Sequence, residues 1–359
     1  MSGTLIIRAD SSEMTGIGHI MRCIALGQAW HEQYGGNVTF ISHCQNDALR
    51  QRILDKGFAF FPLSNPHPHP SDLKLTLNIL KSFQSNESVI SRNLLTMKPW
   101  FVLDGYNFTP DYQHAIRDAG YKLLLIDDYN NLPNYHSDIL LNPNISAESL
   151  NYVCNEDTIK LLGTKYVPLR KEFRQYNGCK KKMPEKAGNL LVTLGGTDPN
   201  NVALKVIEAL NQLSDAELEA RVVLGPSNPN IPIIEQVISD FKLPVSLIHA
   251  PTSKEMVKAM TWADLAVSAG GSTCWELCFC QVPMLVVIVA ENQNEIGWGL
   301  DQFGAAKCLG WHEEMASKDL ASEVINIVDD KSLRINMVKN ARECVDGSGV
   351  QRVLKVMGN

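Results

Sequence analysis

Short apolar runs alternate along this chain with longer segments in which apolar residues recur at helical spacing. The runs at 5–9 and 284–289 have the length of buried strands, whereas 19–34 and 201–213 have the periodicity of amphipathic helices. Strands that alternate with helices are typical of parallel sheets joined by crossover helices. The pattern occurs in each half of the chain, so we expect an α/β protein with two such units.

The apolar runs give a strand prediction for both halves. In the first half, strands are predicted at 5–9, 38–43, 58–62, 100–103, 123–126 and 139–141, and helices at 19–34, 47–56, 72–97 and 112–119. In the second half, strands are predicted at 190–194, 222–224, 245–248, 265–267 and 284–289, with a helix at 201–213, further helices between the strands and a helical tail from 317. No function follows from the segment 65–97 or from the tail.

A polar segment at 176–188 separates the halves. It contains four lysines, two glycines and one proline, a composition that suits a linker. We therefore predict an N-terminal Rossmann-like domain at 1–175 and a C-terminal Rossmann-like domain with a helical tail at 189–359. Ligands of open parallel sheets bind at the carboxyl ends of the strands, so we expect the site in a cleft between two facing sheets.

The charge balance excludes some classes of function. The chain has 33 Lys and Arg against 39 Asp and Glu, a net charge of −6. Such a chain lacks the clustered basic surface that a nucleic-acid backbone requires. The basic run at 180–182 is more typical of a solvated linker than of a binding patch. We expect no nucleic-acid partner.

The apolar runs and the cysteines indicate in which cell compartment the protein is expected. The longest apolar run, at 282–290, is far shorter than the roughly 18 residues of a membrane span, so no membrane insertion is expected. Asp10 interrupts the N-terminal apolar stretch, which argues against a signal peptide. Nine cysteines without a CxxC pair then indicate free thiols in the cytoplasm. The histidines of the HPHP segment at 67–70 are interpreted as part of a surface turn, and no metal site is predicted.

A glycine-rich loop follows the first predicted strand. Gly16 and Gly18 let the backbone approach an anion at a helix N-terminus, but a dinucleotide fingerprint would need a third glycine where Met21 stands. His19 begins the helix and can exchange a proton near neutral pH. A plain strand-to-helix turn with a capping or packing histidine is the alternative interpretation.

Carboxylates follow two later strands of the first half. Asp104 can orient a neighbouring side chain or bind a sugar hydroxyl, and Tyr106 can stack or donate a hydrogen bond. Asp127 and Asp128 could hold a metal ion, but adjacent side chains in an extended chain point apart, which disfavours that interpretation.

The second half offers three more polar clusters at strand ends. One is the glycine turn at 195–198. Another is the turn at 268–273, which leads into a helix and suits a pyrophosphate, with Glu276 placed one turn later to reach a ribose. The third is the Glu-Asn-Gln string at 291–293, which suits hydrogen bonds to sugar or phosphate. The candidate residues are Gly196, Gly270, Gly271, Ser272, Thr273, Glu276, Asn292 and Gln293.

Together these stretches resemble one known family. The segments that carry the resemblance are RADSSEMTGIGHIMRC (8–23), DGY (104–106), IDDY (126–129), YVPLRKEFR (166–174), VTLGGTDP (192–199), ADLAVSAGGSTCWELCFCQVP (263–283) and ENQ (291–293). They are similar, in order, to the PseG family, the UDP-sugar hydrolases of pseudaminic acid biosynthesis. The turn before Glu276 is shared more widely with MurG-like glycosyltransferases.

The resemblance implies a fold, a reaction and site residues. The fold would be the glycosyltransferase B type. The reaction would be hydrolysis of UDP-2,4-diacetamido-2,4,6-trideoxy-β-L-altrose at the anomeric C–O bond, with inversion and without a required cofactor or metal. His19 would be catalytic, Tyr106 would lie near the sugar, and the nucleotide would contact the turn at 270–273, Glu276 and Asn292. Arg170 enters as a further substrate-binding candidate from its matched segment.

Three functions stay open from the sequence. A UDP-sugar hydrolase is preferred, a transferase with another acceptor would use the same fold and donor, and a non-catalytic sugar-nucleotide binder would leave His19 without a role. The epimer of the sugar and the oligomeric state do not follow from residue identities.

Overall fold

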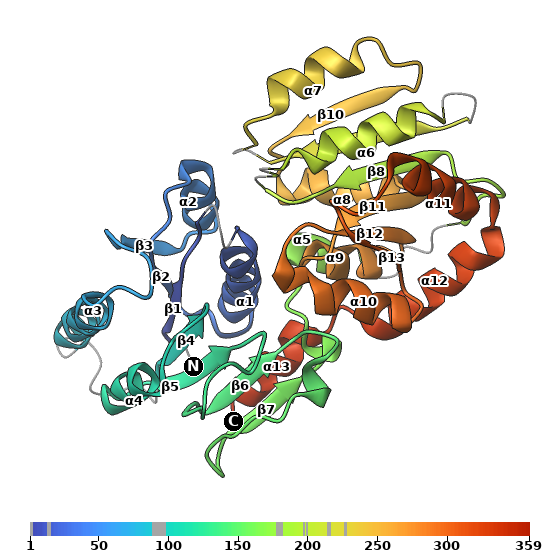
Figure 1. The fold of residues 1–359 in the computed structure, drawn as a ribbon. Coiled ribbons are helices and arrows are strands. Elements are labelled where there is room, and N and C mark those ends of the chain that lie inside the picture. The colour runs from blue at the N-terminus through green and yellow to red at the C-terminus, as the bar shows by residue number, and fades with distance from the viewer. Residues whose placement is uncertain are drawn as a thin grey trace. The chain divides into compact units, whose positions relative to one another are not determined.

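The computed structural model describes residues 3–12, 16–87, 98–176, 182–196, 198, 200–213, 217–225 and 228–359. They form two compact units (Figure 1). Unit 1 comprises Met1–Arg170 together with Ser348–Asn359, and unit 2 comprises Lys171–Gly347. Each unit is a parallel α/β sheet, which confirms the predicted fold class.

The sheet of unit 1 contains seven parallel strands in the order β3-β2-β1-β4-β5-β6-β7. Their bounds are β1 Leu5–Ala9, β2 Val38–Ser42, β3 Ala59–Pro62, β4 Trp100–Asp104, β5 Lys122–Ile126, β6 Ile139–Asn142 and β7 Ile159–Leu162. The helices are α1 Gly18–Tyr34, α2 Asp47–Leu54, α3 Asp72–Glu87, α4 Pro110–Asp118 and α13 Gly349–Met357.

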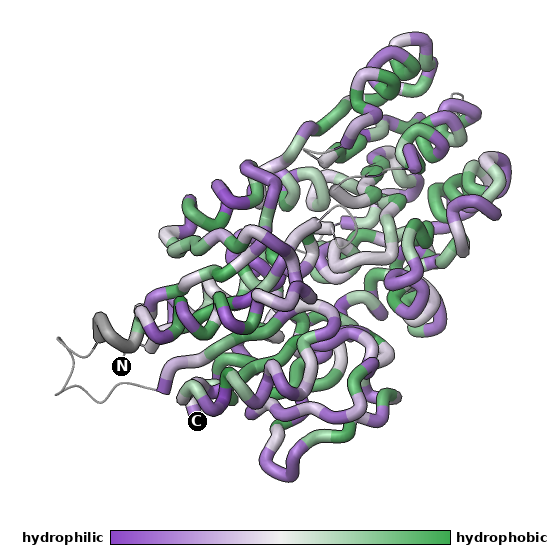
Figure 2. Tube along the Cα trace, turned by 60° about the vertical axis from the view of Figure 1, so that its left-hand side comes forward, coloured by the Kyte–Doolittle hydropathy of each residue, from purple (hydrophilic) through white to green (hydrophobic). Residues whose placement is uncertain are grey.

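Side chains of β1 project from both faces of this sheet and pack into the cores on each side. Leu5 and Ile7 pack with residues of α1 and α13, whereas Ile6 packs with residues of α3 and α4. Helices therefore cover both faces, which is why the strands are almost entirely apolar. The hydropathy colouring alternates along the outer helices, as expected of helices that bury one side (Figure 2).

Unit 2 repeats this plan with the strand order β10-β9-β8-β11-β12-β13. The strands are β8 Asn189–Thr193, β9 Glu219–Leu224, β10 Val245–His249, β11 Leu265–Ala269, β12 Met284–Ile288 and β13 Lys307–Trp311. The helices are α5 Lys171–Arg174, α6 Val202–Asn211, α7 Ile231–Ile238, α8 Ser253–Trp262, α9 Thr273–Phe279, α10 Asn294–Gln302, α11 Ser317–Asp329 and α12 Lys331–Cys344. Its main core joins α6 and α11 to the central strands.

Every predicted strand is present, but two strands were not predicted. β7 is a short, largely exposed edge strand, and Lys160 interrupts its apolar run IKLL. β13 contains Gly310 in a left-handed conformation (φ +77°), which interrupts its apolar pattern. Helix α3 covers the first part of the predicted helix at 72–97, and residues 88–97 lie outside the described part of the chain.

The tail and the linker also differ from the prediction. The tail was expected within the C-terminal domain, but α13 returns to unit 1, where Val353 and Leu354 are buried in the core. The boundary between the units lies after Arg170, ahead of the predicted linker. Within that linker, residues 177–181 are outside the described chain, and the carbonyls of Pro184 and Glu185 accept hydrogen bonds from the buried Arg334.

The strand order reverses at one point in each sheet. In unit 1 this point lies between β1 and β4, and in unit 2 between β8 and β11. Connections leave such a switch point in opposite directions, so the loops after these strands are the preferred places for a ligand. The predicted clusters at Gly16–His19, Asp104–Tyr106, 195–198 and 270–273 follow these four strands.

Candidate active site

The switch point of unit 1 places a histidine and an arginine on one face of α1. His19 and Arg22 are three residues apart, so their side chains project from the same side of the helix. Gly16 precedes the helix with φ +69°, a conformation that favours glycine, and the Ser11 hydroxyl donates to its carbonyl oxygen at 2.9 Å. The glycine loop thus turns the chain from β1 into α1, with His19 in the first turn.

Asp104, the last residue of β4, holds both side chains. Its carboxylate is fully buried, and Oδ1 lies 2.7 Å from Nδ1 of His19. Arg22 donates to both oxygens of Asp104, from Nη2 at 2.6 Å and from Nε at 2.7 Å. The thiol of Cys23 donates to Oδ2 at 3.2 Å. A carboxylate can only accept. Nη2 of Arg22 also lies 3.1 Å from Nδ1, but its two hydrogens point to Asp104 and Asp128, so the imidazole hydrogen is assigned to Nδ1 and the lone pair of neutral His19 to Nε2.

A second carboxylate, Asp128 after β5, completes the ion-pair network around Arg22. Nη1 of Arg22 donates to Oδ1 of Asp128 at 2.8 Å, and Nη2 donates to Oδ2 at 2.9 Å. The amide of Asn144 donates to Oδ1 at 2.9 Å. The two carboxylates and the guanidinium leave one net negative charge next to His19.

Burial alone would raise the pKa of Asp104, but the charge of Arg22, together with the hydrogen bonds from Arg22 and His19, outweighs burial and holds this pKa well below its usual range. The pKa of Asp128 is lowered in the same way, because Arg22 outweighs its burial. The pKa of Arg22 is raised by both aspartates despite its burial. All three groups are therefore charged at neutral pH.

Tyr106 lies beside this network. Its ring meets the His19 imidazole edge to face, with ring centres 5.0 Å apart, and lies 5.4 Å from the ring of Tyr129. The loop between Asp104 and Tyr106 turns at Gly105, where φ is +151° and an added Cβ would lie 3.2 Å from the Phe108 ring. The sequence-predicted residues His19, Asp104 and Tyr106 thus come together.

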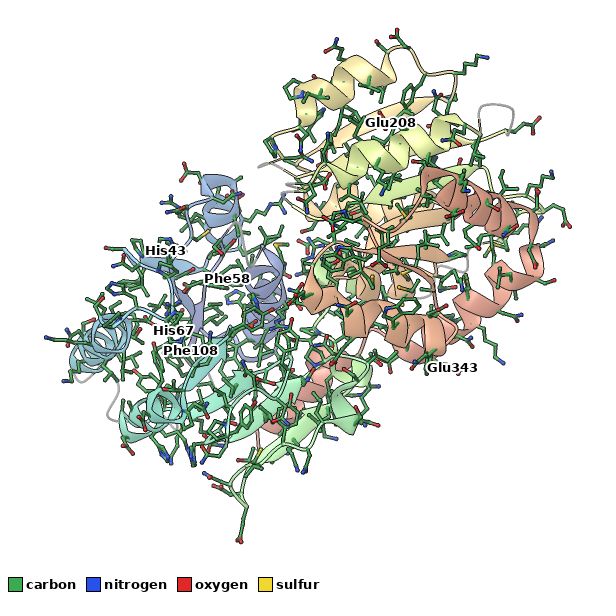
Figure 3. All side chains as sticks on the ribbon, in the orientation of Figure 1. His43, Phe58, His67, Phe108, Glu208 and Glu343 are labelled. Carbon is green, nitrogen blue, oxygen red and sulfur yellow. The ribbon has the colours of Figure 1, made fainter. Side chains whose placement is uncertain are left out.

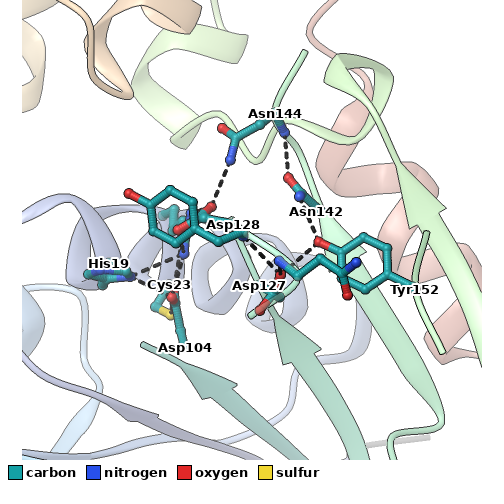
Figure 4. A network of polar contacts seen from close by, with 11 residues as sticks. His19, Cys23, Asp104, Asp127, Asp128, Asn142, Asn144 and Tyr152 are labelled. Atoms are coloured by element: carbon teal, nitrogen blue, oxygen red, sulfur yellow. Dashed lines mark hydrogen bonds and ion pairs between the residues drawn. The ribbon is translucent and has the colours of Figure 1, made fainter. Parts of the chain in front are cut away.

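The polar network continues along the carboxyl edge of the sheet (Figure 4). Asp127 accepts hydrogen bonds from the Tyr152 hydroxyl at 2.7 Å and the Tyr135 hydroxyl at 3.2 Å. Tyr152 in turn accepts from Asn142, whose oxygen binds the backbone amide of Asn144. As predicted, Asp127 and Asp128 have different partners. Asp127 anchors the sheet edge, whereas Asp128 joins the His19 network.

The switch point of unit 2 brings a glycine turn against the Glu-Asn-Gln string. The side-chain oxygen of Gln293 accepts from the amides of Gly270 at 3.2 Å and Val289 at 3.1 Å. An added Cβ on Gly270 would lie 2.9 Å from the Gln293 carbonyl oxygen, so glycine is needed there for packing. The side-chain oxygen of Gln293 thus ties the end of β12 to the turn, and the binding of sugar or phosphate by Gln293 stays a prediction.

The other predicted residues at this switch point are less buried than Gly270. An added Cβ on Gly271 would meet nothing within 4 Å. Ser272 and Asn292 are exposed, Thr273 begins α9, and Glu276 is half-buried within that helix. These residues leave the turn accessible, in contrast to Gly270.

The first glycine turn of unit 2 has a structural partner of its own. Gly225 after β9 packs on Gly196 so closely that an added Cβ would lie 1.9 Å from the Gly196 carbonyl oxygen. Asp198, two residues after Gly196, is buried. Its carboxylate accepts hydrogen bonds from the backbone amides of Val202 and Ala203 and so caps α6. Burial raises the pKa of Asp198, and these hydrogen bonds oppose the rise.

Two predicted substrate contacts, Asp104 and Arg170, are buried in the structure. Both oxygens of Asp104 are bound by protein side chains and the residue is fully buried, so it orients His19 and has no exposed carboxylate for a sugar. Arg170 is buried at the end of unit 1. Burial of Arg52 and the nearby positive charge of Arg170 lower the pKa of Arg52, and substrate binding by Arg170 stays a prediction.

Sequence reasoning missed Arg22, Asn144 and the pairing role of Asp128. Arg22 could have been found from its i+3 spacing to His19. Asn144 had no such signal, because its contact with Asp128 depends on how β5 and β6 align.

Two further features concern the described part of the chain, namely metal ligands and membrane spans. Within it, no three His, Cys, Asp or Glu side chains are grouped as a metal site, and no helix has the length and apolar character of a membrane span. The eight described cysteines are free thiols, and Cys179 lies outside the described residues.

Residues 189–353 match the glycosyltransferase family 28 C-terminal domain. An uncharacterised protein of Methanocaldococcus jannaschii is 26% identical over 81% of this chain, which spans 57% of that protein's length. A UDP-2,4-diacetamido-2,4,6-trideoxy-β-L-altropyranose hydrolase of Campylobacter jejuni is 26% identical over 84% of this chain and 97% of its own length.

Solved structures resemble the whole chain. Acinetobacter baumannii MurG superposes with a TM-score of 0.62 at 13% identity, covering 99% of each chain. MnaA of S. aureus, solved with UDP, gives a TM-score of 0.64 at 12% identity over 98% of this chain and 95% of its own. These likenesses show a MurG-like fold of the glycosyltransferase B type, as the sequence resemblance implies.

Proposed function

We propose that this protein, which has a MurG-like fold of the glycosyltransferase B type, hydrolyses a UDP-linked diacetamido-trideoxy-hexose to UDP and the free sugar. The reaction would belong to pseudaminic acid biosynthesis. The substrate we propose is UDP-2,4-diacetamido-2,4,6-trideoxy-β-L-altrose. The observation that carries the proposal is the 2.7 Å contact between His19 and the buried Asp104, because it prepares a base. The similarity to the Campylobacter jejuni hydrolase supports the choice of reaction and substrate.

His19 acts as the general base in this proposal. Asp104 keeps the imidazole hydrogen on Nδ1, so Nε2 takes a proton from water as the water oxygen forms a bond to C1. The bond between C1 and the β-phosphate oxygen breaks, and its electron pair leaves with UDP. The negative charge of the Asp104–Arg22–Asp128 network stabilises the imidazolium that forms. Attack opposite the leaving group inverts C1, and Tyr106, packed on His19, positions the sugar or the water.

Unit 2 binds the UDP portion in this proposal. The turn at 270–273 offers the backbone amides of Ser272 and Thr273 to the pyrophosphate, since those of Gly270 and Gly271 donate within the protein, and Glu276 binds the ribose. Gly271 has room for the backbone to approach a ligand closely. Gln293 contributes indirectly by holding the turn, and the exposed Asn292 contacts phosphate or sugar.

A proton NMR time course tests this function. We expect the purified protein, without added metal, to release the inverted free sugar from the UDP-altrose derivative and not from UDP-N-acetylglucosamine or UDP-diacetamidobacillosamine. His19→Asn removes the base, so kcat should fall by roughly 10² to 10⁴ while UDP affinity is retained. An unchanged kcat in this variant would contradict the role of His19.

A glycosyltransferase with the same donor is the second candidate, because residues 189–353 match a glycosyltransferase domain. The same assay separates the two. Tight binding of UDP with no sugar released from any of the three compounds would favour a transferase that lacks its acceptor, or a sugar-nucleotide binder without activity.

A further inference from the structure

A second histidine–carboxylate cluster lies behind the loop that carries Tyr106. Arg8, fully buried in β1, donates from Nε to Asp72 at 3.1 Å and from Nη2 to Asp10 at 2.8 Å. Asp72, the first residue of α3, also lies 2.8 Å from Nδ1 of His67 through its other oxygen. Asp10 accepts the backbone amide of His67 at 2.8 Å. The HPHP segment is therefore more than the surface turn that its sequence predicts.

Both ring nitrogens of His67 face groups that can only accept. Nδ1 faces the Asp72 carboxylate, and Nε2 lies 2.9 Å from the backbone carbonyl oxygen of Asn107. Burial alone would raise the pKa of Asp72, but His67 and Arg8 lower it, so the carboxylate is ionised at neutral pH. Two acceptors require two N–H groups, and only the imidazolium form of histidine has both.

The ring contacts and the charge balance agree with a cationic His67. Its ring stacks on Phe108 with centres 3.9 Å apart and planes 16° from parallel (Figure 3). An aromatic face attracts a cation. With His67 protonated, the two cations Arg8 and His67 balance the two anions Asp10 and Asp72. The hydroxyl of Tyr112, whose ring also packs on His67, donates to Thr76 at 3.0 Å.

The His67 contacts hold one end of the loop 104–108. The other end is Asp104, which is bound to His19 and Arg22. Between them, Gly105 has φ +151°, which glycine readily adopts, and Asn107 has φ +69°, which is uncommon for a residue other than glycine. Phe108 is buried between His67 and Tyr112, and its carbonyl accepts from Gln113 at 2.8 Å. Tyr106 is thus carried on a loop fixed on both sides.

We propose that His67, as an imidazolium clamped between Asp72 and the Asn107 carbonyl, is a positioning residue that sets Tyr106 against His19. The effect on turnover rests on the proposed function, whereas the charge of His67 and the order of the loop do not. A histidine that only stabilises the segment 64–72 would leave the loop and its Tyr106 unaffected.

Two amide variants separate the two hydrogen bonds. The side-chain nitrogen of Asn takes about the place of Nδ1, so His67→Asn keeps the bond to Asp72 and loses the one to Asn107. The nitrogen of Gln takes about the place of Nε2, so His67→Gln can still reach Asn107. His69→Ala is the matched control, because the side chain of His69 contacts Ser71 in the same segment.

Hydrogen exchange tests the loop without any substrate. We expect amide exchange in a peptide spanning 104–109 to rise several-fold in His67→Asn, to rise less in His67→Gln and to stay unchanged in His69→Ala. In ¹⁵N-histidine NMR spectra at neutral pH, both His67 nitrogens should give the shifts of protonated nitrogen, with the signals assigned by their loss in His67→Gln. Unchanged exchange in His67→Asn, or a neutral His67 ring, would overturn the proposal.

Kinetics test the consequence for turnover. A reacting group displaced by about 1 Å can cost about 100-fold in rate, so we expect kcat to fall about 10- to 100-fold in His67→Asn with little change in KM, and to recover partly in His67→Gln. A changed KM with unchanged kcat would contradict positioning. A wild-type protein without turnover would refute the proposed function alone, since exchange and NMR still decide the role of His67.

Discussion

The Asp104 carboxylate binds three side chains at once. It accepts from His19, Arg22 and Cys23, all on one helix, and it is completely buried. A buried carboxylate is stable only when cations and donors surround it, so Asp104 and Arg22 depend on each other. The same arrangement that prepares His19 therefore also contributes to folding.

The acid sensitivity of the protein should reflect this residue. The pKa of Asp104 is lower in the folded chain than the value of about 3.9 in an unfolded one, so its contribution to stability is present above about pH 4 and is lost as the pH falls toward the folded pKa. In Asp104→Asn, urea unfolding should show lower stability at neutral pH and a slope with pH below 4 that is smaller by up to about 1.4 kcal/mol per pH unit.

Asp118→Asn, at an exposed position of α4, is the control for this measurement. It should leave stability at neutral pH close to that of the wild type. If Asp104→Asn kept the full wild-type slope below pH 4, the carboxylate would not be the paired group that the structure describes.

At the scale of elements, the turn between β11 and α9 has two adjacent glycines with different reasons to be glycine. Gly270 is in contact with the Gln293 backbone, whereas Gly271 faces open space. Packing therefore explains the first glycine, whereas no described neighbour requires the second, which leaves room for the proposed nucleotide.

Alanine at these two positions should separate packing from binding. Gly270→Ala should lower the unfolding free energy by about 1–3 kcal/mol, because its methyl group overlaps the Gln293 carbonyl. Gly271→Ala should fold with nearly wild-type stability, yet bind UDP more weakly by calorimetry if the pyrophosphate approaches that backbone. Unchanged UDP affinity in a folded Gly271→Ala would remove the turn from the proposed nucleotide site.

At the scale of the whole molecule, the chain returns to its first unit at its end. The indole nitrogen of Trp100 donates to the Met357 carbonyl at 3.0 Å, and the Tyr34 hydroxyl donates to the Leu354 carbonyl at 2.9 Å. Val350, Val353 and Leu354 lie in the same core as β1 and α1. Unit 1 is therefore incomplete until the last twelve residues are in place.

A substitution near the C-terminus should consequently destabilise the N-terminal sheet. Leu354→Ala should cost about 2–5 kcal/mol, because it leaves a cavity in the core of unit 1. Hydrogen exchange should speed up in β1 and β4 while unit 2 keeps its protection. Lys355→Ala, at the exposed neighbouring position, is the control. Faster exchange confined to unit 2 would contradict the assignment of α13.

Sequence patterns determined the strands with the highest apolar content and the residues that follow them. Buried parallel strands such as β12 are apolar on both faces, so they stand out in the sequence. Edge strand β7 and glycine-interrupted β13 do not meet that condition, so they were missed. His19, Asp104 and Tyr106 were found because polar residues after buried strands are conspicuous.

Only the tertiary structure decided which of those residues act on one another. Asp104 and Asp128 become partners of Arg22 through the order of β1, β4 and β5, and nothing local in the sequence specifies that order. The contact of His67 with Asn107 joins residues 40 positions apart. The periodicity of α13 likewise predicts an apolar helix face, but it does not indicate which of the two cores that face packs against. Local patterns fix which side chains must be buried, whereas hydrogen bonds and packing between distant segments depend on how the strands are ordered.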